Sequence, residues 1–320
     1  MTRTGPDRLL AAEVAHAQGA ALSVRQIFWR RFLRHRLAFL SLVFLLLLGL
    51  ASASAPLVEA ALGVDGNLVD LFNAKQPPSA AHPLGTDELG RDVLVRLLYG
   101  GQVSLVVGLA AALCAAVIGT LLGLTAGYYG GRLDSLLMRF TDGVIALPIL
   151  PLLIILAAID LSKAGLPQAL VDSESVSLYR IVFLIALVGW TTVARLVRGA
   201  TLSMKTREFV CAAEALGATA PRIMLVHILP NVVSPIIVAT TLSIGGIVLL
   251  ESVLSFLGLG IQPPLPSWGN MLTSAQELIW DAPALAIYPG LLIFATVIAF
   301  NFLGDGLQDA LDPRALQGED

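Results

Sequence analysis

The sequence predicts an all-α integral membrane protein with six transmembrane helices. Hydrophobic residues make up 56% of the 320 residues and charged residues 13%, whereas a soluble domain has about 45–50% and about 25%. Six apolar runs approach or exceed the length that crosses a bilayer as a helix, about 20 residues. A helix pairs its own backbone groups, which the water-free hydrocarbon requires.

A basic segment precedes the first transmembrane helix. Residues 1–36 are polar and carry seven arginines, and the first apolar run covers 37–57. Its end, an alternation of Ala and Ser at 51–55, is similar to a signal-peptidase site, so cleavage is the alternative. We favour a retained helix, because the leading segment is too long for the n-region of a signal peptide and the run is long enough to span.

The second apolar run follows a long polar connection, 58–102. Val93, Leu94, Leu97 and Leu98 have helical spacing within it, which predicts an amphipathic helix at the outer membrane interface. The second span, 103–127, is rich in Gly and Ala, which indicates close packing against another helix.

The remaining runs complete the set of six. We place them at 136–159, 179–197, 232–250 and 284–303. Pro148 and Pro151 are expected to kink the third span, and Arg139 and Asp142 form an i, i+3 pair near its start. A polar loop, 160–178, separates the third and fourth spans.

The distribution of positive charge predicts the orientation. With the N-terminus in the cytoplasm, the inner segments hold the seven early arginines and eight further Lys or Arg, and the outer segments hold five. Positive charge favours the cytoplasmic side, and a charge at a helix centre costs roughly 2.5–3.5 kcal/mol. Both termini and the connection 201–230 are therefore predicted to be cytoplasmic. This divides the chain into a basic segment 1–36, a first helix 37–57, a periplasmic segment 58–102 with its interfacial helix, a five-helix core 103–303 and a tail 304–320.

The connection 201–230 is polar and lies between two apolar runs, and its residues predict two short helices. Thr206 is expected to cap the first helix, with Glu208 in its first turn and Gly217 at its end. The second is expected to begin at Thr219 and to end at Pro230.

The first of these helices carries an apolar stripe. Phe209, Ala212, Ala213 and Leu216 recur at i, i+3, i+4 and i+7. A short helix with such a stripe, containing two small residues, is suited to a groove on another protein.

This connection resembles the EAA loop of ABC-transporter permeases, Glu-Ala-Ala followed after three residues by Gly and after nine more by Ile-x-Leu-Pro. The matching positions are Ala212, Ala213, Gly217, Leu229 and Pro230. Cys211 replaces the glutamate of the motif and His227 its isoleucine. Glu208 and Glu214 lie three residues either side of Cys211, and either one is a candidate for the missing charge.

Further stretches resemble the C-type membrane subunit of the oligopeptide, dipeptide and nickel ABC importers. They lie at 82–92, 126–131, 139–142, 190–198, 227–231, 254–260 and 301–313. The resemblance implies the type I importer permease fold in a bacterial or archaeal inner membrane, with 201–230 as the coupling loop of the core. It also implies a homologous B-type permease, two cytoplasmic ATPase subunits and an extracytoplasmic solute-binding protein as partners. No nucleic-acid-binding pattern is present.

The chain itself is predicted not to be an enzyme. It contains no Gly-x-x-x-x-Gly-Lys-Ser/Thr phosphate loop, so ATP and magnesium are expected on the partner subunits. Two cysteines and four histidines lack metal-ligand spacing, and no cofactor or metal is expected here. The resemblance implies a seat for the ATPases at Glu208, Phe209, Cys211, Ala212, Ala213, Glu214, Leu216, Gly217, Arg222, Leu229 and Pro230.

The predicted function is peptide import by alternating access. Nickel, glutathione or another small solute is the alternative within the family; an ATP-independent secondary transporter is the alternative outside it, although the third span lacks a deep acidic residue that such carriers often use. Candidate pathway residues are Trp190, Glu251 and Asn301. Each has a plainer interpretation: a packing tryptophan, a glutamate in interfacial water, and an amide that hydrogen-bonds at the inner mouth.

Overall fold

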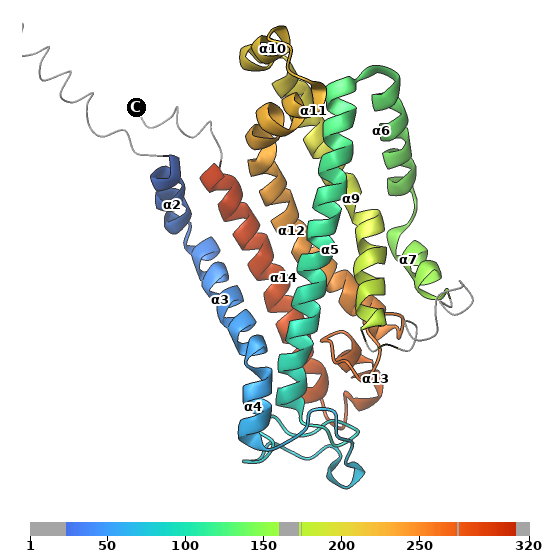
Figure 1. Cartoon of the computed structure of the whole chain (residues 1–320). Coiled ribbons are helices and arrows are strands. Elements are labelled where there is room, and N and C mark those ends of the chain that lie inside the picture. The colour runs from blue at the N-terminus through green and yellow to red at the C-terminus, as the bar shows by residue number, and fades with distance from the viewer. Residues whose placement is uncertain (1–23, 160–172, 174, 274, 312–320) are drawn as a thin grey trace, which may run out of the picture.

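The computed structural model describes residues 24–159, 173, 175–273 and 275–311, and its regular elements within these ranges are helices (Figure 1). Predictions for residues 1–23, 160–172 and 312–320 lie outside the described residues. Five stretches are long and apolar enough to span: α3 (Arg36–Ala53), α5 (Val93–Tyr129), α9 (Val176–Lys205), Ala220–Phe256 and α14 (Ala284–Leu311). A bent pair, α6 (Gly131–Ala146) and α7 (Ile149–Ala157), makes a sixth if it counts as one span.

Helix α5 lies at the centre of the bundle, in contact with α3, α9 and α12 (Leu229–Phe256). Its glycines let α9 approach closely, as the second span predicted. A Cβ on Gly119 would lie 2.6 Å from the Trp190 carbonyl oxygen, and one on Gly123 would lie 2.6 Å from the Ala194 carbonyl oxygen. These close contacts fix the two helices against each other.

The predicted interfacial helix is not a separate element. Helix α5 begins at Val93, where the Asp92 carboxylate accepts a 2.8 Å hydrogen bond from the Val95 amide. Val93 and Leu97 are buried in a cluster with Trp268 of the loop after α12. The amphipathic spacing therefore coincides with packing against protein at the start of α5, and the predicted separate helix is absent from this described stretch.

The third span is broken more sharply than a kink. Helices α6 and α7 meet at 84°. Leu147 is extended, with ψ 135°, because the proline that follows it disfavours the helical conformation. That proline, Pro148, directly precedes the first residue of α7. Pro151 falls in the first turn of α7, where its missing N–H costs nothing. Asp142 pairs across to Arg195 of α9.

The predicted pair of short helices is only half right. Helix α10 (Glu208–Ala215) ends before Gly217, whose φ is +82°, but Arg207 rather than Thr206 is its N-cap residue. The second helix continues from α11 (Ala220–Arg222) through a π-helical stretch, η2 (Ile223–Ile228), into α12. Pro230 does not end this second helix. It lies in the first turn of α12, directly after the wider π-helical turns.

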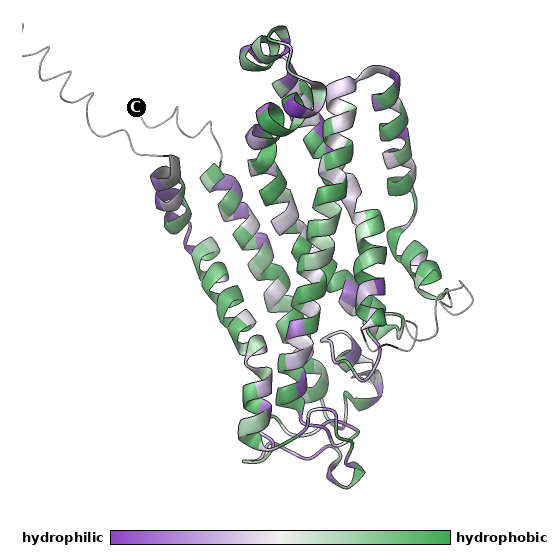
Figure 2. Ribbon diagram, viewed as in Figure 1, coloured by the Kyte–Doolittle hydropathy of each residue, from purple (hydrophilic) through white to green (hydrophobic). Residues whose placement is uncertain are grey.

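Helix α2 (Val24–Arg34) and the C-terminal end of α14 lie at the same end of the bundle as α10 (Figure 1). The opposite end holds α4 (Ala55–Leu62), the long connection to α5, and α13 (Ala275–Leu278). This connection contains η1 (Leu71–Asn73), and η3 (Asn270–Leu272) precedes α13. Hydrophobic residues dominate the long helices and hydrophilic residues gather toward their ends (Figure 2).

Candidate functional site

Helix α10 projects from one end of the bundle and is fastened by one face (Figure 1). Val210 is 1% exposed and packs in a cluster with Ile223 and Ile228 of η2 and Val197 of α9. Ala213 is also buried. We call α10, α11 and η2 together the elbow. The elbow is joined by apolar contacts to the two long helices that flank it.

The opposite face of α10 is open. Leu216 is 89% exposed and Phe209 is 44% exposed, although both are large apolar side chains. Glu208, Cys211, Ala212 and Glu214 are exposed as well. Apolar side chains at such exposure on a helix tip indicate a surface for another protein.

The predicted ATPase seat therefore needs correction at two positions. Ala213 lies at the edge of the apolar stripe and turns inward beside Val210, so it supports the elbow from inside. Leu229 is half-buried against the cluster beneath the elbow. Gly217, Arg222 and Pro230 are exposed. Both candidate replacements for the motif glutamate, Glu208 and Glu214, are exposed, and the choice between them stays open.

Polar contacts tie neighbouring helices together below the elbow. The Arg198 guanidinium of α9 binds the Asp134 carboxylate of α6 through both oxygens, with 2.6 Å between Nη2 and Oδ2. Lys205, the last residue of α9, donates to the Tyr128 carbonyl oxygen of α5. Bidentate guanidinium–carboxylate pairs fix geometry as well as adding energy. Helices α5, α6 and α9 are thus held together where α10 begins.

Two of the three candidate pathway residues are buried in helix packing. Trp190 is 4% exposed; its ring stacks on Phe140 at 5.9 Å and its Nε1 donates to the Leu187 carbonyl oxygen at 2.8 Å. The geometry matches the plainer interpretation, a packing tryptophan. Asn301, by contrast, is exposed on α14 and donates to the Val297 carbonyl oxygen at 2.9 Å.

Glu251 is buried, so its interpretation as a glutamate in interfacial water is wrong. It is 0% exposed. Ser255 Oγ donates to its Oε1 at 2.6 Å and Ser104 Oγ of α5 donates to its Oε2 at 3.2 Å. Ser104 Oγ also accepts from the Trp268 amide at 3.3 Å. Glu251 therefore joins α12, α5 and the loop around Trp268 that follows α12.

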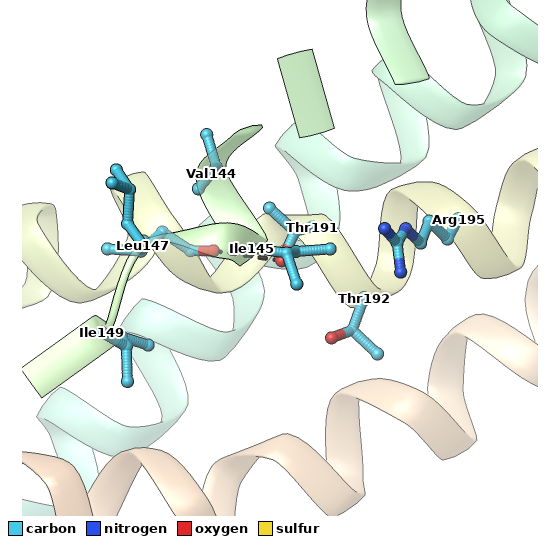
Figure 3. A pocket seen from close by; sticks show the side chains of 8 residues that line it. Val144, Ile145, Leu147, Ile149, Thr191, Thr192 and Arg195 are labelled. Atoms are coloured by element: carbon cyan, nitrogen blue, oxygen red, sulfur yellow. Dashed lines mark hydrogen bonds between the residues drawn. The ribbon is translucent and has the colours of Figure 1, made fainter. Parts of the chain in front are cut away.

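A cavity that the sequence did not predict lies where α6 breaks into α7 (Figure 3). Its volume is about 360 Å³. The lining side chains come from the break and from the facing side of α9: Val144, Ile145, Leu147, Ile149, Val188, Thr191, Thr192 and Arg195. In the sequence, the two prolines are the signal that points to this place, but they predict only a kink. The space lies beside the sharper 84° break between α6 and α7.

The fold and the elbow define a multi-pass membrane protein with an exposed, partly apolar helical surface at one end. Residues 119–317 match the family model described as a binding-protein-dependent transport system inner membrane component. Residues 23–78 match the model for the N-terminal TM domain of oligopeptide transport permease C. The chain belongs to this family of ABC-importer permease subunits.

Curated relatives match along nearly their whole length. The glutathione transport system permease protein GsiD of Pectobacterium atrosepticum is 41% identical over 90% of each chain. The dipeptide transport system permease protein DppC of Alkalihalophilus pseudofirmus is 38% identical over 93% of this chain and 92% of its own. The oligopeptide transport system permease protein OppC of Bacillus subtilis is 37% identical over 89% and 88%. The chain is a multi-pass inner-membrane protein of the same kind, and such permease subunits are not themselves enzymes.

Proposed function

We propose that this chain forms half of the translocation pathway of an importer for short peptides or a peptide-like solute such as glutathione. The observation that carries the proposal is the elbow, whose open apolar face lies at the end of two long membrane helices. The named solutes of the relatives support the substrate class. Nickel or another small solute stays an alternative, and the relatives give no support to an ATP-independent carrier.

The elbow is proposed to lie in the cytoplasm, with both termini on the same side. Helix α2, which contains four arginines, lies at the elbow's end of the bundle, and positive charge favours the cytoplasmic side. Two cytoplasmic ATPase subunits would bind the elbow and carry the ATP and magnesium. A homologous B-type permease would complete the pathway, and an extracytoplasmic binding protein would deliver the solute.

The proposed mechanism is alternating access driven through the elbow. Closure of the ATPases moves the elbow, and the contacts of Arg198 and Lys205 carry the motion to α5 and α6. The continuous helical segment from α11 through η2 carries the same motion into α12. This chain supplies the lever and the pathway, and the partners supply the energy.

Substitution of Leu216 by Asp tests the proposed ATPase seat. A charge placed in an apolar groove should weaken ATPase binding by about 2 kcal/mol, which is roughly 30-fold. The measurement is ATPase retained on the purified membrane subunits in a titration. Leu133→Asp is the matched control, because Leu133 is an exposed leucine in the first turn of α6, where a negative charge suits the helix dipole. Equal retention by both variants would overturn the assignment of the seat.

A further inference from the structure

The cavity at the α6–α7 break differs in polarity from a larger groove on the surface of the bundle. The groove between α5 and α12 has a volume of about 540 Å³ and is lined by aliphatic side chains with three threonines. The cavity at the break contains Arg195 and two threonines, Thr191 and Thr192, among only eight lining residues. Thr192 lies near the middle of α9.

Two features of this cavity are unsuited to lipid. The first is the ion pair between Arg195 and Asp142, whose side chains are 49% and 60% exposed, since charged side chains within spanning helices almost always face protein or water rather than lipid. The second is the break itself, where Leu147 and Pro148 are extended and interrupt the helix. Non-helical backbone at membrane depth is tolerated only inside protein or beside water.

We propose that this cavity is a solute-contacting part of the translocation pathway, in which Arg195 binds a carboxylate of the peptide-like solute. The inference rests on the proposed function. Asp142 engages one nitrogen, Nη2, of the guanidinium, and a guanidinium has five N–H donors, so others remain for a carboxylate. The Thr192 side chain lies beside Arg195 on α9 (Figure 3), and its hydroxyl would supply a further hydrogen bond to the solute. Asp142 is a positioning residue that holds the guanidinium toward the cavity.

Cysteine labelling tests whether the cavity is wet in the assembled complex. Thr192→Cys and Thr241→Cys place a thiol in the polar cavity and in the apolar groove, respectively. A small, membrane-impermeant cationic thiol reagent, read residue by residue by mass spectrometry, should label Thr192→Cys at least about tenfold faster. Native Cys114, exposed within the apolar spanning part of α5, is an internal reference for labelling. Equal, slow labelling at both positions would overturn the proposal, whether lipid or the second permease covers the cavity.

Transport by the reconstituted complex tests the role of Arg195. Arg195→Gln should lower the maximal rate of uptake of a dipeptide with a free C-terminal carboxylate at least about tenfold. The exchanged pair, Arg195→Asp with Asp142→Arg, keeps an ion pair but moves the guanidinium to α6. Uptake should stay low in the exchanged pair if Arg195 binds the solute, and should recover if the ion pair is only structural, which would overturn the proposal.

Controls separate failure of this inference from failure of the proposed function. Thr192→Val removes the hydroxyl without changing charge, so it tests the cavity even if the exchanged pair fails to assemble. It should lower uptake severalfold. Full uptake would overturn the proposal that the cavity contacts the solute. Arg132→Gln removes an exposed arginine of α6 that does not line the cavity, and uptake should stay normal. If the unmodified complex imports no peptide or glutathione, the proposed function itself fails.

Discussion

At the scale of single residues, Glu251 is the buried acidic side chain that joins three parts of the chain. It accepts hydrogen bonds from Ser255 of its own helix and from Ser104 of α5. Ser255 Oγ in turn accepts from the Ile261 amide at 3.0 Å. Gly269 of the loop after α12 packs so closely that a Cβ there would lie 2.5 Å from Ser252 Cα. This loop is therefore held to α12 by a carboxylate and by close backbone contact.

Removal of the Glu251 carboxylate should destabilise the fold. In Glu251→Ala the buried hydroxyls of Ser104 and Ser255 lose their acceptor, at about 1–3 kcal/mol for each unsatisfied group. We expect a lower unfolding temperature for the purified complex, measured by the fluorescence of its tryptophans. Glu251→Gln keeps a carbonyl oxygen to accept from Ser255, so it should lie between Ala and the unmodified chain. An unchanged unfolding temperature in Glu251→Ala would contradict this account.

The sequence predicts local backbone features better than it predicts which side chains are exposed. Gly217 has the positive φ expected of a helix stop, because that requirement is local. The sequence predicts open surfaces for Ala213 and Glu251, but both are buried, because their burial depends on contacts with η2 and with the loop after α12. Distances along the chain do not reveal those contacts.

At the scale of helices, the small-residue face of α5 sets the distance between α5 and α9. Gly123→Leu should separate them, because the added side chain meets the Ala194 carbonyl oxygen and the Val197 side chain; overpacking of this kind typically costs about 1–3 kcal/mol. The yield of monodisperse protein after detergent extraction measures the effect. Gly49→Leu on α3 is the matched control, with no heavy atom within 4 Å of the new Cβ. A similar yield of both variants would show that the close approach is dispensable.

The apolar runs predicted which segments are helices but not how those helices are joined. Pro148 separates α6 from α7, whereas Pro230 lies within the continuous path from η2 into α12. The helix continues through π-helical turns into the segment that holds Pro230, whereas the extended residue Leu147 precedes Pro148. Local backbone geometry of this kind is selected by packing, so sequence alone could not predict the cavity at the break.

At the scale of the whole molecule, the orientation can be tested with two thiols. Cys211 is exposed on the elbow, and Ser79→Cys would add a thiol to the exposed connection at the opposite end. In cells that lack the ATPase subunits, a membrane-impermeant maleimide should label Cys211 only in inverted vesicles and Ser79→Cys only in spheroplasts. The reverse pattern would place the elbow outside and remove the basis for ATPase coupling.

The residues from Ala220 to Phe256 form one candidate span without an interruption. At 1.5 Å per residue its 37 residues extend roughly 55 Å, from the elbow to beyond Glu251. A rigid body of that length that pivots by only ~5° about one tip displaces the other tip by ~5 Å. Small angular strokes at the elbow would thus suffice to shift the opposite end of the bundle by about the width of an amino acid, without a relay of intermediate parts.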